Sequence, residues 1–164
     1  MPNDFLEIKS TYERLGFSIT NVRHHEESNE YSACGFLLNN KEIEFRTGKI
    51  TPTKPGHFVA IWKRDNTGKT VPFDTADGID FMVIAVREKK HFGQFIFPKS
   101  VLADQGIITQ NDKEGKRGMR VYPPWSKDLN KQAQKTQKWQ GDHFLDLNSE
   151  TLTSTLIKKM LSRD

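Results

Sequence analysis

The sequence has a single cysteine and no long apolar segment. Cys34 has no second cysteine to pair with, which fits a reducing cytoplasm better than an oxidising compartment. No stretch approaches the ~18 consecutive apolar residues that a membrane-spanning helix needs. Residues 1–10 also lack the basic and apolar regions of a secretory signal. We therefore expect a cytoplasmic protein without a membrane segment.

Motifs that bind common cofactors are missing as well. The chain contains no Walker loop, no GxGxxG fingerprint and no zinc-ligand spacing. The run His24-His25-Glu26-Glu27 offers metal-ligand side chains, but neighbours on one loop rarely converge on a single ion. We interpret this run as a solvated connector. The sequence thus leads us to expect no cofactor and no metal, and we name no catalytic residue from its motifs.

The length and the apolar spacing of the chain predict one α+β domain. A chain of 164 residues buries about 68–70 % of its unfolded surface, enough for a core, so we take residues 1–164 as a single domain. Helical spacing and capping residues predict helices over 5–15, 98–106, 130–140 and 149–161, the last capped by Asn148 or Ser149. Apolar runs and alternation predict strands over 17–22, 32–38, 42–46, 58–62, 78–86, 93–97 and, as the last, 118–122. The most apolar run, 78–86, is expected at the centre of a mostly antiparallel sheet flanked by helices.

Positive charge is concentrated in two segments, although the net charge is only +4. Residues 41–69 carry seven basic side chains against three acids, and residues 116–139 carry seven against Asp128 alone. The three tryptophans, Trp62, Trp125 and Trp139, lie in these same segments. Lysine and arginine neutralise phosphates while aromatic rings stack on bases, so the pattern favours a nucleic-acid-binding protein of low sequence specificity. It leaves open DNA or RNA, and single or double strands.

Two other functions compete with binding alone. A Mg²⁺-dependent nuclease of the restriction type needs an acid on one strand and an acid-x-Lys triplet on the next. Asp80 with Glu88 or Glu44 is the set that comes nearest to this pattern, but Ile61 stands where an acid would precede Trp62-Lys63. The third alternative is a structural role in which the basic face meets an acidic protein or a small anion.

Five blocks of the sequence resemble the MepB family of bacterial proteins. They are FRTGKITPTKPGHFVAIWKR (45–64), GIDFMVIAV (78–86), GQFIFPKSVL (93–102), GKRGMRVYPPW (115–125) and NKQAQKTQKWQ (130–140). The resemblance implies a restriction-endonuclease-like core that binds nucleic acid and has no established catalytic centre. The family is named for a gene cluster that encodes a multidrug efflux pump, but this chain has no span and gives no support to a transport role.

The resemblance and the charge pattern together give a set of expected nucleic-acid contacts. The resemblance implies basic residues on the binding face, namely Arg46, Lys49, Lys54, Lys63, Arg64, Arg117 and Arg120. The charge pattern adds hydroxyl, aromatic and further basic side chains, namely Thr51, Thr53, Trp62, Lys116, Tyr122, Trp125, Lys131 and Lys135. Lys131, Lys135 and Lys138 fall at i, i+4 and i+7, so we expect them on one face of the helix 130–140.

Overall fold

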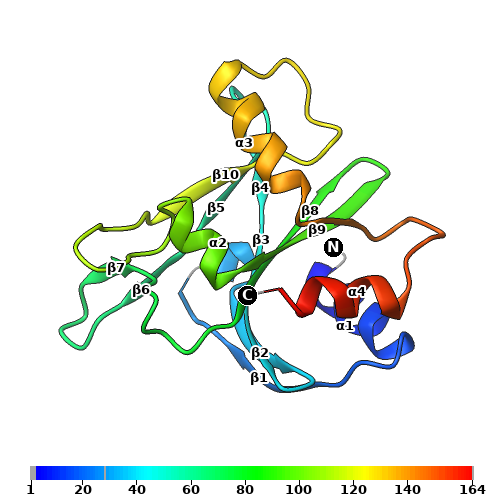
Figure 1. Cartoon of the computed structure of the whole chain (residues 1–164), viewed down its shortest axis with the longest axis horizontal. Coiled ribbons are helices and arrows are strands. Elements are labelled where there is room, and N and C mark those ends of the chain that lie inside the picture. Colours follow the sequence, from blue (N-terminus) through cyan, green and yellow to red (C-terminus); the bar gives the residue numbers. More distant parts are fainter. Residues whose placement is uncertain (1–2, 28, 164) are drawn as a thin grey trace.

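The computed structural model of the chain describes residues 3–27 and 29–163, which form one α+β domain around a six-stranded sheet (Figure 1). The strand order is β1-β2-β3-β8-β9-β11. These strands are β1 (Ile19–His24), β2 (Cys34–Leu38), β3 (Lys41–Thr47), β8 (Phe81–Glu88), β9 (His91–Pro98) and β11 (Phe144–Asp146). β3 and β8 pair in parallel, and the four other neighbouring pairs are antiparallel. The prediction of a mostly antiparallel central sheet flanked by helices is confirmed.

The apolar run 78–86 supplies β8, a strand in the middle of the sheet, as predicted. Residues 81–86 of β8 are buried on both faces of the sheet, so the strand reads as continuously apolar rather than alternating. β8 continues into β9 through a tight turn, and β2 continues into β3 through Asn39-Asn40. Asn39 adopts a φ of +53°, a conformation that asparagine tolerates better than most residues. The predicted strands 32–38 and 42–46, and 78–86 and 93–97, thus form two hairpins.

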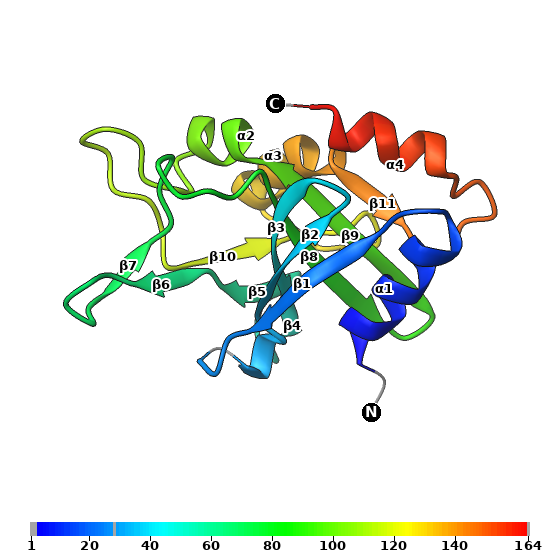
Figure 2. The same cartoon turned by 90° about the horizontal axis from the view of Figure 1, so that it is seen from below.

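Four α-helices of the described residues cover the two faces of the sheet, and a short 3-10 helix, η1 (Asn29–Tyr31), precedes β2 (Figure 2). α1 (Asp4–Arg14) and α4 (Ser154–Leu161) contribute apolar side chains to the hydrophobic cluster on one face. α2 (Lys99–Asp104) contributes to the cluster on the other face, next to which α3 (Lys131–Gly141) places Trp139. None of the helices in the described residues is long and apolar enough to cross a membrane.

Two small sheets extend from the second face of the main sheet. One has the order β10-β5-β4, formed by β10 (Gly118–Val121), β5 (His57–Ala60) and β4 (Lys49–Ile50). The other is the hairpin of β6 (Trp62–Arg64) and β7 (Thr70–Pro72). The prediction of one strand over 58–62 is therefore wrong, because the chain passes from one small sheet to the other at Ile61. The backbone N–H of Ile61 still donates to the carbonyl of Arg117 (2.9 Å), and its side chain is buried.

Two other local predictions are corrected by the structure. The cap of the last helix is Thr153, whose Oγ1 accepts a hydrogen bond from the N–H of Leu156 (3.2 Å), and not Asn148 or Ser149. The strand 118–122 is not the last one, because β11 follows α3 and pairs with β9. A strand of three residues is too short to show a period of two in the sequence.

Candidate nucleic-acid interface

A groove of about 690 Å³ lies between α3 and the strands β5 and β10. We call it the α3 groove. Its cations are Lys54, Lys116, Arg120 and Lys135. Its aromatic side chains are Phe58, Tyr122 and Trp139, and its amides are Gln105, Gln132 and Gln140. Among the described residues no aspartate or glutamate lines the groove, so it has a local excess of positive charge.

The four cations are held in two different ways. Arg120 is fixed, because its guanidinium donates to the carbonyl of Pro55 (3.1 Å) and to Oγ1 of Thr51 (2.6 Å). The lysines at 54, 116 and 135 are exposed, and within residues 3–27 and 29–163 none of them is ion-paired with a carboxylate. The groove therefore combines one positioned guanidinium with three exposed ammonium groups that no described carboxylate neutralises.

Two glycines make room for two aromatic rings of the groove. A β-carbon on Gly118 would lie 2.6 Å from Cζ of Phe58, and one on Gly56 would lie 2.6 Å from Cδ1 of Tyr122. Real β-carbons do not come so close to neighbouring atoms, so each ring occupies space that another residue would fill. Gly56 also has a φ of +81°, which favours glycine. The backbone of the groove is thus shaped around its rings.

A buried amide joins the two walls of the α3 groove. Gln140 of α3 has no exposed surface, and its Oε1 accepts a hydrogen bond from the N–H of Tyr122 (2.8 Å). Its Nε2 donates to the carbonyl of Arg120 (3.0 Å). Because both partners belong to the segment that carries groove residues, this amide fixes the helix against β10 and keeps the groove open.

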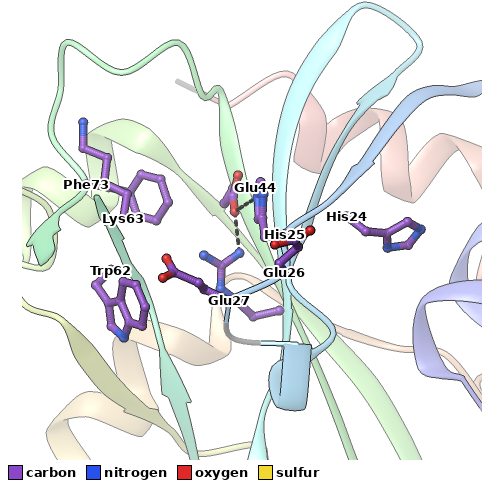
Figure 3. Close-up of a pocket in the computed structure, with 9 residues that line it drawn as sticks. His24, His25, Glu26, Glu27, Glu44, Trp62, Lys63 and Phe73 are labelled. Carbon is purple, nitrogen blue, oxygen red and sulfur yellow. Dashed lines mark hydrogen bonds and ion pairs between the residues drawn. The ribbon is translucent and has the colours of Figure 1, made fainter. Parts of the chain in front are cut away.

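A second hollow, of about 520 Å³, contains three other predicted contacts (Figure 3). We call it the Glu44 hollow. Arg46, Trp62 and Lys63 line it together with Glu26, Glu27, Glu44, His24, His25 and Phe73. In Figure 3, Glu44 and His25 lie on one side of the hollow, and Trp62, Lys63 and Phe73 lie on the other. Acidic and basic side chains are mixed here, so the Glu44 hollow lacks the charge excess of the α3 groove.

The floor of the Glu44 hollow is a buried charge network. Nη1 of Arg46 donates to Oε2 of Glu44, and Nε2 of His25 lies 2.9 Å from the same oxygen. Arg46 also donates to the carbonyls of Ala60 (3.1 Å) and Phe45 (2.9 Å), and only 2 % of its side chain is exposed. The guanidinium of Arg46 is thus already satisfied by protein groups, and a contact between Arg46 and nucleic acid stays a prediction.

Most of the remaining predicted cations have carboxylate partners. Arg64 binds Glu27 at 2.7 Å, Lys49 binds Glu30 at 3.2 Å, and Lys63 binds Asp77 at 2.5 Å. Arg117 binds Glu114 at 3.2 Å and also donates to the carbonyl of Thr70. These ion pairs neutralise four of the basic side chains that were expected to form one positively charged face.

Five predicted contacts remain, and three of them, Thr53, Trp125 and Lys131, lie away from the α3 groove. Trp125 stacks on His91, with ring centroids 4.7 Å apart, and packs against the core. Thr53 and Lys131 are exposed but do not line the groove, and Lys138 lines a separate hollow with Asp142. The other two belong to the groove region: Tyr122 lines the groove wall, and the hydroxyl of Thr51 accepts a hydrogen bond from the groove residue Arg120.

The carboxylates proposed for a nuclease do not meet in the structure. Asp80 and Glu88 stand at opposite ends of β8, about 26 Å apart along the strand. Asp80 accepts a hydrogen bond from the N–H of Glu42 (2.8 Å) and lines a hollow with Lys41 and Lys99. Glu44 faces its own hollow and is bound by Arg46 and His25. Neither combination places two carboxylates around one ion.

Sequence reasoning missed several groove residues. Phe58, Trp139, Gln105 and Gln132 line the α3 groove but were not among the expected contacts. Trp139 follows Lys135 by four residues on α3, a spacing that brings two side chains to the same helix face. That signal was present in the sequence. No comparable signal exists for Gln105, which reaches the groove from a turn after α2.

Comparison with known proteins agrees with the resemblance. A family model described as MepB-like matches residues 25–146. The crystal structure of MepB is similar to this chain with a TM-score of 0.80 and 32 % sequence identity, over 92 % of this chain and 100 % of that one. No curated protein matches the chain. The chain belongs to the MepB-like family.

Proposed function

We propose that the protein binds nucleic acid, DNA or RNA, through the α3 groove and with little sequence specificity. The observation that supports this most is the set of four cations in a groove that no described aspartate or glutamate lines. Phosphates are attracted by such a local excess, whereas the mixed charges of the Glu44 hollow offer no comparable field. Lysines bind phosphates as point charges and do not read base edges, so low specificity follows.

Binding of this kind has a measurable salt dependence. Each phosphate that a lysine or arginine neutralises releases condensed counterions, and the logarithm of the affinity falls linearly with the logarithm of the salt concentration. Four groove cations, if each meets one phosphate, give a slope of about −3 to −4. A steep slope would distinguish phosphate binding from binding by apolar contacts alone.

The test compares two triple variants that remove the same charge. In Lys54→Ala/Lys116→Ala/Lys135→Ala the three unpaired groove lysines are lost. In Lys49→Ala/Arg64→Ala/Arg117→Ala the lost cations are exposed and ion-paired. Fluorescence anisotropy with labelled oligonucleotides, from ~50 mM salt upwards, should show weaker binding and a slope reduced by about 2–3 for the groove variant only.

Two results would contradict the proposal. Equal losses in both variants would mean that net charge matters and the α3 groove does not. Absence of binding to any oligonucleotide at ~50 mM salt would reject nucleic acid as the ligand. A rise in Tm with polyphosphate but not with oligonucleotides would instead support the small-anion alternative.

A cytoplasmic location is part of the same proposal, since nucleic acid is accessible there. The lone cysteine is consistent with it. Cys34 is fully buried, and burial raises the pKa of its thiol to about 12, so the thiol stays protonated and unreactive at neutral pH.

A further inference from the structure

We infer that the α3 groove takes a single strand in preference to a duplex, with unpaired bases stacked on its aromatic rings. This inference rests on the proposed function and narrows its ligand. It is based on the rings of Phe58, Tyr122 and Trp139, which share the groove with the cations. Phosphate binding by itself requires no aromatic side chain, and Trp139 also packs against the core, so the rings of Phe58 and Tyr122 are the ones that need a separate explanation.

The core of the fold does not account for the rings of Phe58 and Tyr122. Both are half-buried, and neither belongs to the two hydrophobic clusters of the described residues. Phe58 meets the ring of Tyr31 edge-on at 6.4 Å and lies 5.9 Å from the guanidinium carbon of Arg120. A ring beside a fixed guanidinium offers a base both a stacking surface and a nearby phosphate contact.

The rings are already in position without a ligand. Gly118 leaves the space that Phe58 fills, and Gly56 leaves the space that Tyr122 fills. Gln140 ties the backbone at Tyr122 and Arg120 to α3. A site whose side chains are held in place loses less conformational entropy on binding, so its rings contribute more of their stacking energy to affinity.

A duplex cannot use rings that are recessed in a groove. The bases of a duplex are paired and stacked inside the double helix, so a protein reaches only their edges. An unpaired strand can turn its bases outward onto aromatic side chains. The volume of about 690 Å³ is in the range of small-ligand pockets and suits a few nucleotides rather than a length of double helix. Stacking accepts every base, which agrees with low sequence specificity.

The experiment compares ligands first and variants second. Labelled ~12-nucleotide strands of DNA and of RNA, and the duplex of the same DNA sequence, are titrated with the whole protein at one salt concentration. We expect the single strands to bind at least about tenfold more tightly than the duplex. The DNA and RNA arms show whether the 2′-hydroxyl matters.

Substitution of the rings then tests stacking directly. Tyr122→Leu and Phe58→Leu should each weaken single-strand binding about 5- to 150-fold while leaving the salt slope unchanged. Phe144→Leu is the matched control, because Phe144 is also half-buried but does not line the α3 groove; it should leave binding unchanged. Tm measurements confirm that each variant is folded.

The outcomes separate this inference from the proposed function. Duplex binding as tight as single-strand binding would overturn the single-strand inference and leave the α3 groove as a phosphate site. Unchanged single-strand affinity in folded Tyr122→Leu would overturn it as well. Failure of every ligand to bind would reject the proposed function itself. If Phe58→Leu fails to fold, Tyr122→Leu and the ligand comparison still decide.

Discussion

The ring of Phe58 lies against the backbone of Gly118, so close that a β-carbon on the glycine would stand 2.6 Å from Cζ of the ring. The two residues belong to paired strands, β5 and β10, in which Gly118 is opposite Ala60 and Arg120 is opposite Phe58. The glycine therefore lets the ring turn into the α3 groove beside the Arg120 guanidinium. This contact links the backbone of a small sheet to the chemistry of the groove.

Gly118→Ala is expected to displace the Phe58 ring. Gly118 has no positive φ, so the added methyl group acts through the collision alone, and an overpacked contact of this kind costs about 1–3 kcal/mol. We expect a lower free energy of unfolding in urea and weaker oligonucleotide binding. The control is Gly78→Ala, since a β-carbon there meets nothing within 4 Å. Equal effects of the two substitutions would show that the fit of the ring is unimportant.

Gln140→Leu is expected to loosen α3 from β10. The leucine fills a similar volume but leaves the N–H of Tyr122 and the carbonyl of Arg120 without their buried partner. An unsatisfied buried polar group costs about 1–3 kcal/mol, so the free energy of unfolding should fall by roughly 2–4 kcal/mol. Oligonucleotide binding should weaken too, because the groove walls are no longer tied.

The control for this prediction is Gln134→Leu on the same helix. Gln134 is exposed, and its side chain donates to the carbonyl of Leu129 (2.8 Å), just before α3. Its substitution should change the free energy of unfolding by less than about 1 kcal/mol. If urea denaturation shows the same loss for both variants, Gln140 does not hold the groove walls together.

Local patterns explain which parts of the fold were predictable. The apolar run 78–86 and the helical spacing of residues 130–140 are patterns within one segment, and they appear as the expected strand and helix. The parallel pairing of β3 with β8 and the addition of β11 depend on contacts between distant segments. Periodicity within one strand contains no information about its partner.

The candidate site was predictable only in part, for a similar reason. Counting charges in a segment identifies its basic residues but not their partners. Arg64 is neutralised by Glu27, 37 residues away, and Lys49 by Glu30, 19 residues away. The pairing of Glu44 with Arg46 could have been predicted from the sequence, because alternate residues of a strand share one face.

The pair of Glu44 and Arg46 should be strongly coupled in stability. Removing one partner leaves a buried charge uncompensated, so Arg46→Met or Glu44→Gln alone should cost about 3–5 kcal/mol. The double variant should cost clearly less than the sum of the two, as a denaturation-based double-mutant cycle would show. Lys9→Met with Glu13→Gln, an exposed pair on α1, serves as the control and should couple by no more than about 0.5 kcal/mol. Additive single costs at Glu44 and Arg46 would contradict the prediction.

His57, the neighbour of Phe58 on β5, points away from solvent and is 1 % exposed. Burial is the main cause that lowers the pKa of its imidazole, and the nearby Arg120 acts in the same direction. The Glu88 carboxylate and the Gly48 backbone act in the opposite direction without reversing the shift. The folded protein thus holds His57 neutral at a pH where an unfolded chain would protonate it.

The consequence is a loss of stability in mild acid. Below about pH 6.5 the unfolded chain takes up a proton at His57 that the folded protein does not, so the free energy of unfolding falls by up to about 1.4 kcal/mol per pH unit until the lowered pKa is reached. His57→Gln should flatten this part of the curve relative to the wild type, whatever its effect at neutral pH. Urea denaturation at a series of pH values from about 7 to 5 measures the difference. Parallel curves for the wild type and His57→Gln would mean that His57 is protonated equally in the folded and unfolded states.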